Sequence, residues 1–341
     1  MVGEVQQEAL GAAVAMLCRD ALGPDTEVVE VKRLTAGASA TTHRVRVRVG
    51  ASGTERALIL RRAAPGDPFG GRVGPALEAA TQAAVFAAGG PVAEVVAAFE
   101  AHSVLGDGYL MGCLEGETLG PRIVRDPAFG AARAALVGQC AQALACIHDV
   151  SPGDLPSLPV RGAETQLDEL MRLHRSFGER APVLEAAFRV LRDDRPETSE
   201  GPCLVHGDFR VGNLVVGPAG LVGVLDWELT HLGDPVEDLG WLCVAAWRFG
   251  GAGAVGGVGD RGALLAAYER ASGRAVDPTA LRYWELFGNL KWAIICQYQA
   301  YAHLRGAARS VERAVIGRRV AEVERDVLHL LRGDREEVTC R

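Results

Sequence analysis

Three polar residues in the second half of the chain have the types and the order that phosphoryl transfer requires. Asp208 and Asn213 share one short segment, and Asp226 follows it after two apolar runs. Phosphoryl transfer needs a carboxylate that takes the proton of the attacking hydroxyl. It also needs an amide and a second carboxylate that hold magnesium against the nucleotide phosphates. These three residues therefore predict a phosphotransferase reaction.

The residues between these groups predict how they come together. Two apolar runs, 214–216 and 221–225, flank the turn-forming sequence Gly-Pro-Ala-Gly at 217–220. Apolar runs on either side of such a turn are typical of a β-hairpin. The expected hairpin would return Asp226 to the neighbourhood of Asn213, as a shared metal site requires.

The elements that must position these residues differ between the two parts of the chain. The first part has a helix at 1–22, a second helix at about 75–88, and strand-like runs at 28–34, 43–49, 57–61, 92–99 and 108–114. The second part is poor in strands, with helical patterns at 128–148, 165–177, 183–192, 236–247, 263–271, 279–304 and 311–331. We predict an α+β protein with a β-rich domain at 1–113 and a larger helical domain at 114–341.

Composition restricts the class of protein. The chain has 341 residues, 48% hydrophobic and 23% charged, as in ordinary globular proteins. The formal net charge of −7 argues against nucleic acid or an anionic membrane as the main partner. No apolar run reaches the roughly 20 residues that a membrane span needs. The apolar stretch 9–18 follows acidic residues, so we interpret it as an amphipathic helix and not a signal peptide.

The cysteines indicate a reducing compartment. All eight are spread along the chain, and no pair has the C-x-x-C spacing of a zinc or redox site. A chain of this size needs no disulfide framework. Reduced thiols in the cytoplasm are the simpler interpretation.

Several segments together resemble a known family. They are Arg-Leu-Thr-Ala-Gly-Ala-Ser at 33–39, Leu-Ile-Leu-Arg-Arg at 58–62, Glu-Gly-Glu at 115–117, Leu-Ala-Cys-Ile-His at 144–148, Leu-Val-His-Gly-Asp at 204–208, and the run from Leu225 to Trp241. These segments resemble the aminoglycoside phosphotransferase and choline kinase-like group, which shares the two-lobed fold of protein kinases. The likeness is closest to the branch related to the kinase-like domain fused to some acyl-CoA dehydrogenases. It covers nearly the whole chain and implies a small five-stranded antiparallel lobe followed by a mainly helical lobe.

The resemblance implies roles for the polar residues of the helical lobe. Asp208 corresponds to the catalytic base or to the group that orients the nucleophile, and Arg210 to a cation that neutralises the γ-phosphate. Asn213 and Asp226 correspond to the magnesium ligands, which suits the preference of Mg²⁺ for oxygen. Glu228 would share the face of Asp226 in an extended segment, where it either reaches a second ion or is purely structural.

The same resemblance implies a nucleotide site in the small lobe. Arg61 stands where kinases carry a lysine that contacts the α- and β-phosphates, and Glu78 is its expected ion-pair partner. The turn ending at Ser39 would lie over the phosphates. Backbone groups of Gly112 and Leu114 would hydrogen-bond the purine.

Other residues of these segments are expected to be structural. His206 corresponds to a packing residue that braces the loop of the catalytic base. Asp234 and Asp238 fit the start of a helix and would hold the metal-bearing loop in place. The tryptophans at 241, 247, 284 and 292 are more typical of a core than of a ligand cage. The Gly-x-Gly-x-x-Gly sequence at 251–256 lacks a preceding strand and an acidic ribose partner, so it indicates a flexible loop and not a dinucleotide site.

The sequence thus predicts an ATP- or GTP-dependent kinase that uses Mg²⁺ and phosphorylates a hydroxyl of a small molecule. The region 260–305 has few acids to receive the amines of an aminoglycoside, namely Asp260, Glu269, Asp277 and Glu285. A hydroxylated metabolite or acyl derivative is therefore favoured over an aminoglycoside as acceptor. A non-catalytic, kinase-like nucleotide-binding module and a true aminoglycoside phosphotransferase remain the alternatives.

Overall fold

The computed structural model describes residues 2–34, 40–63, 71–196, 201–306 and 309–333. It contains two compact units. The first consists of Met1–Gly116 with two returning segments, Val150–Leu158 and Val222–Thr230, and the second contains the remaining residues. The domain boundary expected at residues 113 and 114 stays a prediction.

The first unit contains the five-stranded antiparallel sheet that the sequence predicts. The strands are β1 (Glu27–Arg33), β2 (Ala40–Val49), β3 (Thr54–Ala63), β4 (Val95–His102) and β5 (Gly106–Gly112). Their order in the sheet is β1-β2-β3-β5-β4, and all the paired neighbours are antiparallel. The register of β3 places Arg61 opposite Tyr109 of the adjacent strand β5.

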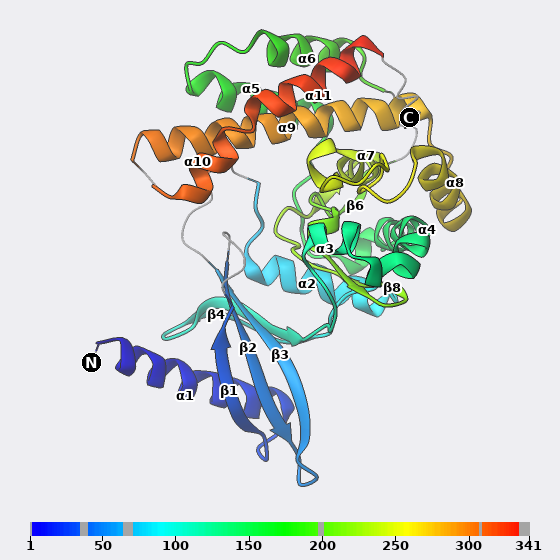
Figure 1. The fold of residues 1–341 in the computed structure, drawn as a ribbon. Helices are drawn as coiled ribbons and strands as arrows, with labels where there is room; N and C mark the ends of the chain where they lie inside the picture. The colour runs from blue at the N-terminus through cyan, green and yellow to red at the C-terminus, as the bar shows by residue number, and fades with distance from the viewer. Residues whose placement is uncertain (1, 35–39, 64–70, 197–200, 307–308, 334–341) are drawn as a thin grey trace. The chain divides into compact units, whose positions relative to one another are not determined.

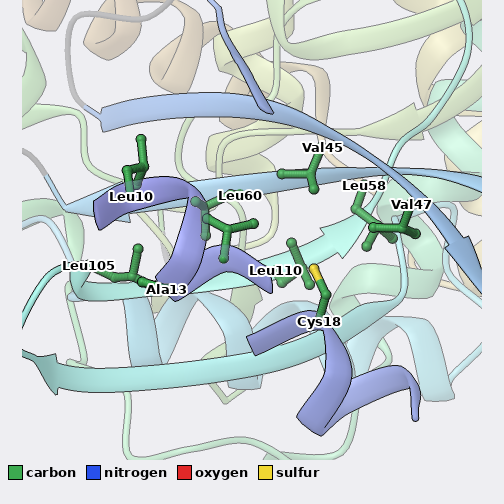
Figure 2. Close-up of a cluster of buried hydrophobic side chains, with 10 residues drawn as sticks. Leu10, Ala13, Cys18, Val45, Val47, Leu58, Leu60, Leu105 and Leu110 are labelled. Carbon is green, nitrogen blue, oxygen red and sulfur yellow. The ribbon is translucent and has the colours of Figure 1, made fainter. Parts of the chain in front are cut away.

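Helix α1 (Val2–Leu22) closes the core on one face of this sheet (Figure 1). Its buried residues Leu10, Ala13 and Cys18 recur at helical spacing and so form one apolar stripe. Figure 2 shows them packed against strand residues that include Val45 and Leu58. The amphipathic helix expected at this position is confirmed.

Helix α2 (Pro75–Ala87) positions the acidic residue of the predicted nucleotide site. Pro75 occupies the first turn, where its missing N–H costs no hydrogen bond. The buried Ala79 packs against Tyr109 and Met111 of β5. The same helix carries Glu78, which is buried.

The second unit is mainly helical, with short strands around the motif loops. Its helices are α3 (Gly120–Arg125), α4 (Gly130–His148), α5 (Ala163–Ser176), α6 (Pro182–Asp193), α7 (Val236–Cys243), α8 (Arg261–Ser272), α9 (Pro278–Leu304), α10 (Val311–Gly317) and α11 (Val320–Arg332). The 27-residue helix α9 is its central element, and α6, α7, α10 and α11 all pack on it (Figure 1). Within the described residues, the expected mixture of a sheet and a helical region is confirmed.

Three expectations about the helical region need correction. The pattern at 311–331 forms two helices, α10 and α11, and the pattern at 236–247 forms α7 followed by a 3₁₀ turn, η4 (Ala245–Arg248). The glycine-rich segment is a packed loop with bridges between Gly253 and Gly257 and between Val255 and Gly259. A Cβ on Gly257 would lie 2.3 Å from the carbonyl oxygen of Arg248, so these glycines allow close backbone packing.

The residues Pro127–His148 are long and apolar enough to cross a membrane by length and composition alone. The sequence expectation that no run meets this criterion is therefore wrong. The criterion is weak for a single helix, because core helices of globular proteins also meet it. Buried residues of α4 include Leu136, Cys140 and Leu144, and the helix packs against α8 and the strand β6 (Cys203–Val205).

The motif loops are held by two pairs of short strands. Strand β6 pairs with β9 (His231–Gly233), and β7 (Leu214–Gly217) pairs with β8 (Gly220–Val224). The predicted hairpin is thus present. Because β8 runs from the second unit into the first, the expected approach of Asp226 to Asn213 stays a prediction.

Candidate active site

Asp208 lies in the loop after β6, and three side chains hold its carboxylate. Trp241 donates its indole N–H to Oδ1 at 2.7 Å, and Asn213 donates its amide to Oδ2 at 2.6 Å. The Nε of Arg210 lies 3.1 Å from Oδ1 and 3.3 Å from Oδ2. Both oxygens of the predicted base therefore have fixed directions.

Arg210 is ordered by more than its bond to Asp208. Its guanidinium carbon lies 4.7 Å from the ring centroid of Trp247, a cation–π distance. A Cβ on Gly212 would lie 2.2 Å from its Nη1, so the absence of a side chain at 212 leaves room for this conformation. Within the described residues, its terminal Nη atoms have no hydrogen-bond partner. They remain free to bind an oxyanion.

Asn213 links the base to the predicted metal site. Its Nδ2 donates to the carbonyl and to the carboxylate of Asp208, at 3.0 and 2.6 Å. Both contacts use the amide nitrogen, so they leave the hard oxygen Oδ1 available as a ligand. The donor set fits Mg²⁺ in this respect.

A buried carboxylate fixes the loop before Asp208. Asp238 of α7 accepts hydrogen bonds from the backbone N–H groups of His206 and Gly207, at 2.8 and 2.9 Å. His148 contacts it from α4 at 3.2 Å. Burial alone would raise the pKa of the Asp238 carboxyl, but these hydrogen bonds and the nearby histidines hold the pKa below its usual value. Asp238 therefore has a structural role as predicted, but the loop it holds is the one before Asp208 and not the expected metal-bearing loop.

His206 and Asp234 also lie as expected. His206 is buried, and its Nδ1 accepts the backbone N–H of Asp208 at 3.2 Å. Asp234 accepts the N–H of Val236 at the start of α7, at 2.9 Å, and the indole N–H of Trp284. Both residues hold the backbone of the site.

Arg61 is the centre of an ionic cluster in the first unit. Its Nε lies 2.8 Å from Glu78 Oε2, so the predicted ion pair is present. Its Nη2 lies 2.6 Å from Asp226 Oδ1 and 3.4 Å from Glu228 Oε2. Tyr109 donates its hydroxyl to Glu78 at 3.2 Å. Burial would lower the pKa of Arg61, but the surrounding carboxylates raise it, so the guanidinium stays charged.

Asp226 has an unusual backbone conformation. Its φ is +70°, in the left-handed region that few non-glycine residues adopt and that aspartate tolerates better than most. Glu228 begins a turn, so the extended segment assumed from the sequence is absent. The Glu228 carboxylate instead lies between Arg61 and Arg72, 3.3 Å from the Arg72 Nε. Its proposed contact with a second ion stays a prediction.

The remaining predicted nucleotide contacts are only partly visible. Ser39 and its turn lie outside the described residues. The N–H of Gly112 donates to the carbonyl of Glu94 at 2.9 Å, which engages this donor within the sheet. A purine contact at Gly112 is therefore restricted to its carbonyl, and the contact at Leu114 stays a prediction.

The described residues contain no group of three or more His, Cys, Asp or Glu side chains that could hold a metal. The assignment of Asn213 and Asp226 as Mg²⁺ ligands stays a prediction.

Comparison with known proteins identifies the family of the chain. A family model described as the phosphotransferase enzyme family matches residues 30–284. The match covers well over half of the chain, and the chain therefore belongs to this family.

The curated relatives are larger proteins. Acyl-CoA dehydrogenase family member 11 of Mus musculus is 31% identical over 204 residues, which are 55% of this chain and 25% of the relative. Family member 10 of Mus musculus is 29% identical over 235 residues, 64% of this chain and 21% of the relative. The matched region thus spans a quarter or less of each relative.

Solved structures agree on the fold. A protein of Ralstonia eutropha JMP134, provisionally assigned as an aminoglycoside phosphotransferase, superposes with a TM-score of 0.72 at 22% identity, covering 97% of this chain and 99% of that chain. A thermostable mutant of aminoglycoside phosphotransferase APH(4)-Ia, in complex with ADP and hygromycin B, gives a TM-score of 0.60 at 16% identity, covering 94% and 99%. The kinase-like fold is therefore established.

The sequence interpretation missed two partners of the predicted residues. Trp241 was assigned to the core, and Tyr109 was not considered. Trp241 lies three positions after Asp238 in α7, so both share the helix face that meets the catalytic loop. That spacing was a usable signal. The pairing of Tyr109 with Arg61 depends on strand register, which short strands do not reveal.

Proposed function

We propose that this protein transfers the γ-phosphoryl group of ATP or GTP to a hydroxyl of a small molecule. The observation that carries the proposal is the Asp208 carboxylate, held between Trp241, Arg210 and Asn213. A fixed carboxylate beside a cation with free donors suits a base that meets the acceptor hydroxyl next to the transferred phosphate. Catalysis then consists mainly of positioning and electrostatic stabilisation.

In this proposal several residues bind the nucleotide or its metal ion. Arg61 of the first unit binds phosphate oxygens, and Glu78 holds its guanidinium. Asn213 and Asp226 bind Mg²⁺, which when present neutralises charge on the phosphates. Arg210 stabilises the γ-phosphate. Crystal structures of the APH(4)-Ia enzyme with ADP and with AMP-PNP support a nucleotide donor for this fold.

The acceptor in this proposal is a hydroxylated metabolite or acyl derivative and not an aminoglycoside. Three of the four acids in the region 260–305 already have structural partners. Asp260 caps α8, Asp277 caps α9, and Glu285 is buried with Arg261 Nη2 and Arg248 Nη2 at 2.6 and 3.2 Å from its Oε1. They do not supply the converging carboxylates that a polyamine acceptor needs.

The side chains around Asp208 support the same choice. Among the described residues, those in contact with Asp208 or Arg210 include Asn213, Trp241 and Trp247 but no further acid. The Arg210 guanidinium repels the amines of a polycationic acceptor, and no further acid in this set of contacts offsets that repulsion. As a further part of the proposal, we place the protein in the cytoplasm.

The first experiment incubates the protein with Mg-ATP or Mg-GTP and a panel of acceptors. The panel contains aminoglycosides, amino alcohols, sugars, hydroxy acids and hydroxyacyl-CoA esters. Mass spectrometry should find one class of acceptor heavier by about 80 Da, the mass of a phosphoryl group. Asp208→Ala should lower the rate by about 10²- to 10⁴-fold. Asp168→Ala, at an exposed pair with Arg192, should leave it unchanged.

Two results would contradict parts of this proposal. Selective phosphorylation of aminoglycosides would overturn the acceptor class. Absence of transfer to every acceptor, combined with nucleotide binding that needs no metal and survives Asp226→Ala, would support a binding module instead.

A further inference from the structure

Two tryptophans each contact one of the polar groups proposed for catalysis. The indole N–H of Trp241 donates to Asp208 Oδ1 at 2.7 Å. A hydrogen bond to a carboxylate is stronger than one between neutral groups and restricts the rotation of the acceptor. Trp241 therefore selects one orientation of the carboxylate.

Trp247 acts on the neighbouring cation. Its ring lies under the Arg210 guanidinium at 4.7 Å, and Arg210 Nε is bonded to the same Asp208 Oδ1 that Trp241 contacts. The stacking orients the plane of the guanidinium, and therefore also the direction of its free Nη atoms.

The two tryptophans also contact each other. Their ring centroids are 5.3 Å apart, and with Val244 they form one buried cluster. Trp241 comes from α7 and Trp247 from η4, so the ring contact joins the two elements that support the base and the cation. Lys291 of α9 lies over the Trp241 ring at 4.8 Å and donates to the carbonyl of Gly207 at 3.3 Å, which further fixes this ring against the loop.

We propose that Trp241 and Trp247 are a coupled pair of positioning residues, one for Asp208 and the other for Arg210. The aromatic contact between the two rings supports the proposed base and the proposed γ-phosphate cation in one arrangement, in addition to the direct contact between Arg210 Nε and Asp208. This inference rests on the proposed function for its catalytic consequence. The contacts themselves can be tested without any turnover.

The first test is a nuclear magnetic resonance measurement of the indole N–H groups. The chain contains five tryptophans, so five indole signals are expected, and single Trp→Phe variants assign them. Asp208→Ala should move the Trp241 signal strongly and the Trp284 signal little. Asp208→Asn keeps an acceptor oxygen and should move the Trp241 signal less. An unchanged Trp241 signal in Asp208→Ala would overturn the proposal, whether or not the protein is a kinase.

The second test separates positioning from general packing. Trp241→Phe keeps an aromatic ring but removes the donor, and should lower kcat about 10- to 100-fold with the nucleotide KM unchanged. Trp284→Phe is the matched control, because Trp284 also donates its indole N–H to a carboxylate, that of Asp234 at 3.1 Å. It should leave kcat unchanged. Equal losses of kcat in both variants would show a structural role only and overturn the proposal.

A double-mutant cycle tests the coupling. Trp247→Leu removes the stacking on Arg210 and should also lower kcat by about tenfold. If the rings act as a unit, the variant with both changes should lose less activity than the product of the two single losses. A loss equal to that product would show two independent contacts and overturn the coupled pair. Activity unaffected by either change, in a protein with proven phosphotransfer, would overturn the positioning role as well.

Discussion

At the scale of single residues, a cluster of three carboxylates surrounds Arg61. One guanidinium contacts Glu78, Asp226 and Glu228, and its side chain is only 13% exposed. A planar guanidinium with several N–H donors can contact three carboxylates at once, whereas a lysine ammonium is a single point charge. This geometry gives a physical reason for arginine at a position where kinases usually carry a lysine.

Removing this guanidinium should destabilise the protein. Arg61→Ala leaves three carboxylates close together without a cation, so we expect a loss of about 3 kcal/mol in the free energy of unfolding. The free energy of unfolding of Arg61→Lys should lie between that of Arg61→Ala and that of the wild type. Urea unfolding followed by circular dichroism measures both.

An exposed pair provides the control for Arg61. Arg44 contacts Glu115 at 2.7 Å, but the two side chains are 42% and 73% exposed. Solvent screens such a pair, so Arg44→Ala should cost less than about 1 kcal/mol. Equal losses for Arg61→Ala and Arg44→Ala would show that the buried cluster contributes no more than a surface pair.

At the scale of elements, the close packing of α7 against α9 determines where Asp238 and Trp241 lie. Gly240 of α7 makes this contact possible, because a Cβ there would lie 2.5 Å from the Trp284 Cβ and 2.6 Å from its backbone carbon. Backbone atoms cannot move aside as the end of a flexible side chain can. The two helices would have to separate.

Gly240→Ala should therefore lower the free energy of unfolding by about 1–3 kcal/mol. The matched control is Gly138→Ala in α4, where an added Cβ meets nothing within 4 Å. Alanine has the higher helix propensity, so the control should be neutral or stabilising by up to about 1 kcal/mol. Thermal and urea unfolding should give opposite signs for the two variants. A change of the same sign in the free energy of unfolding of both variants would contradict the close contact between α7 and α9.

At the scale of the whole molecule, buried carboxylates couple the stability of the fold to pH. Despite burial, the pKa values of Asp238 and Glu237 lie below their usual values, Glu237 chiefly because of His231. A depressed pKa in the folded state gives stability that is present above the unfolded pKa and lost as pH falls through the folded pKa. Burial raises the pKa values of Asp234 and Glu78. A raised carboxyl pKa in the folded state has the opposite effect, so the contribution of these two groups to stability increases as pH falls.

We expect the free energy of unfolding to fall as pH decreases below about 4, the usual pKa range of Asp and Glu. Urea unfolding midpoints between pH 7 and pH 3 measure this dependence. Asp238→Asn cannot ionise, so it should be less stable at pH 7 and lose less stability on acidification than the wild type. Parallel pH profiles for the two proteins would show that Asp238 does not contribute.

Many of the helices and strands can be predicted from local sequence patterns. The strands of the first unit and helices α2, α4 and α9 begin and end within a few residues of the predicted bounds, because hydrophobic periodicity, proline and glycine mark them. The errors at α10 and η4 arose where the apolar pattern continues through a change of direction. There α10 packs on α9, and Trp247 of η4 belongs to the aromatic cluster.

The sequence by itself identified the residue types that we propose to carry the chemistry. Asp208, Asn213 and Asp226 were identifiable because a base and a pair of oxygen ligands leave a short, ordered pattern in the chain. The tertiary structure decided their partners. Trp241 and Trp247 reach Asp208 and Arg210 from α7 and η4, and Arg61 reaches Asp226 across 165 positions of sequence. Such contacts depend on strand register and helix packing. The order of residues along the chain does not specify either of them directly, so it does not reveal which distant side chains meet.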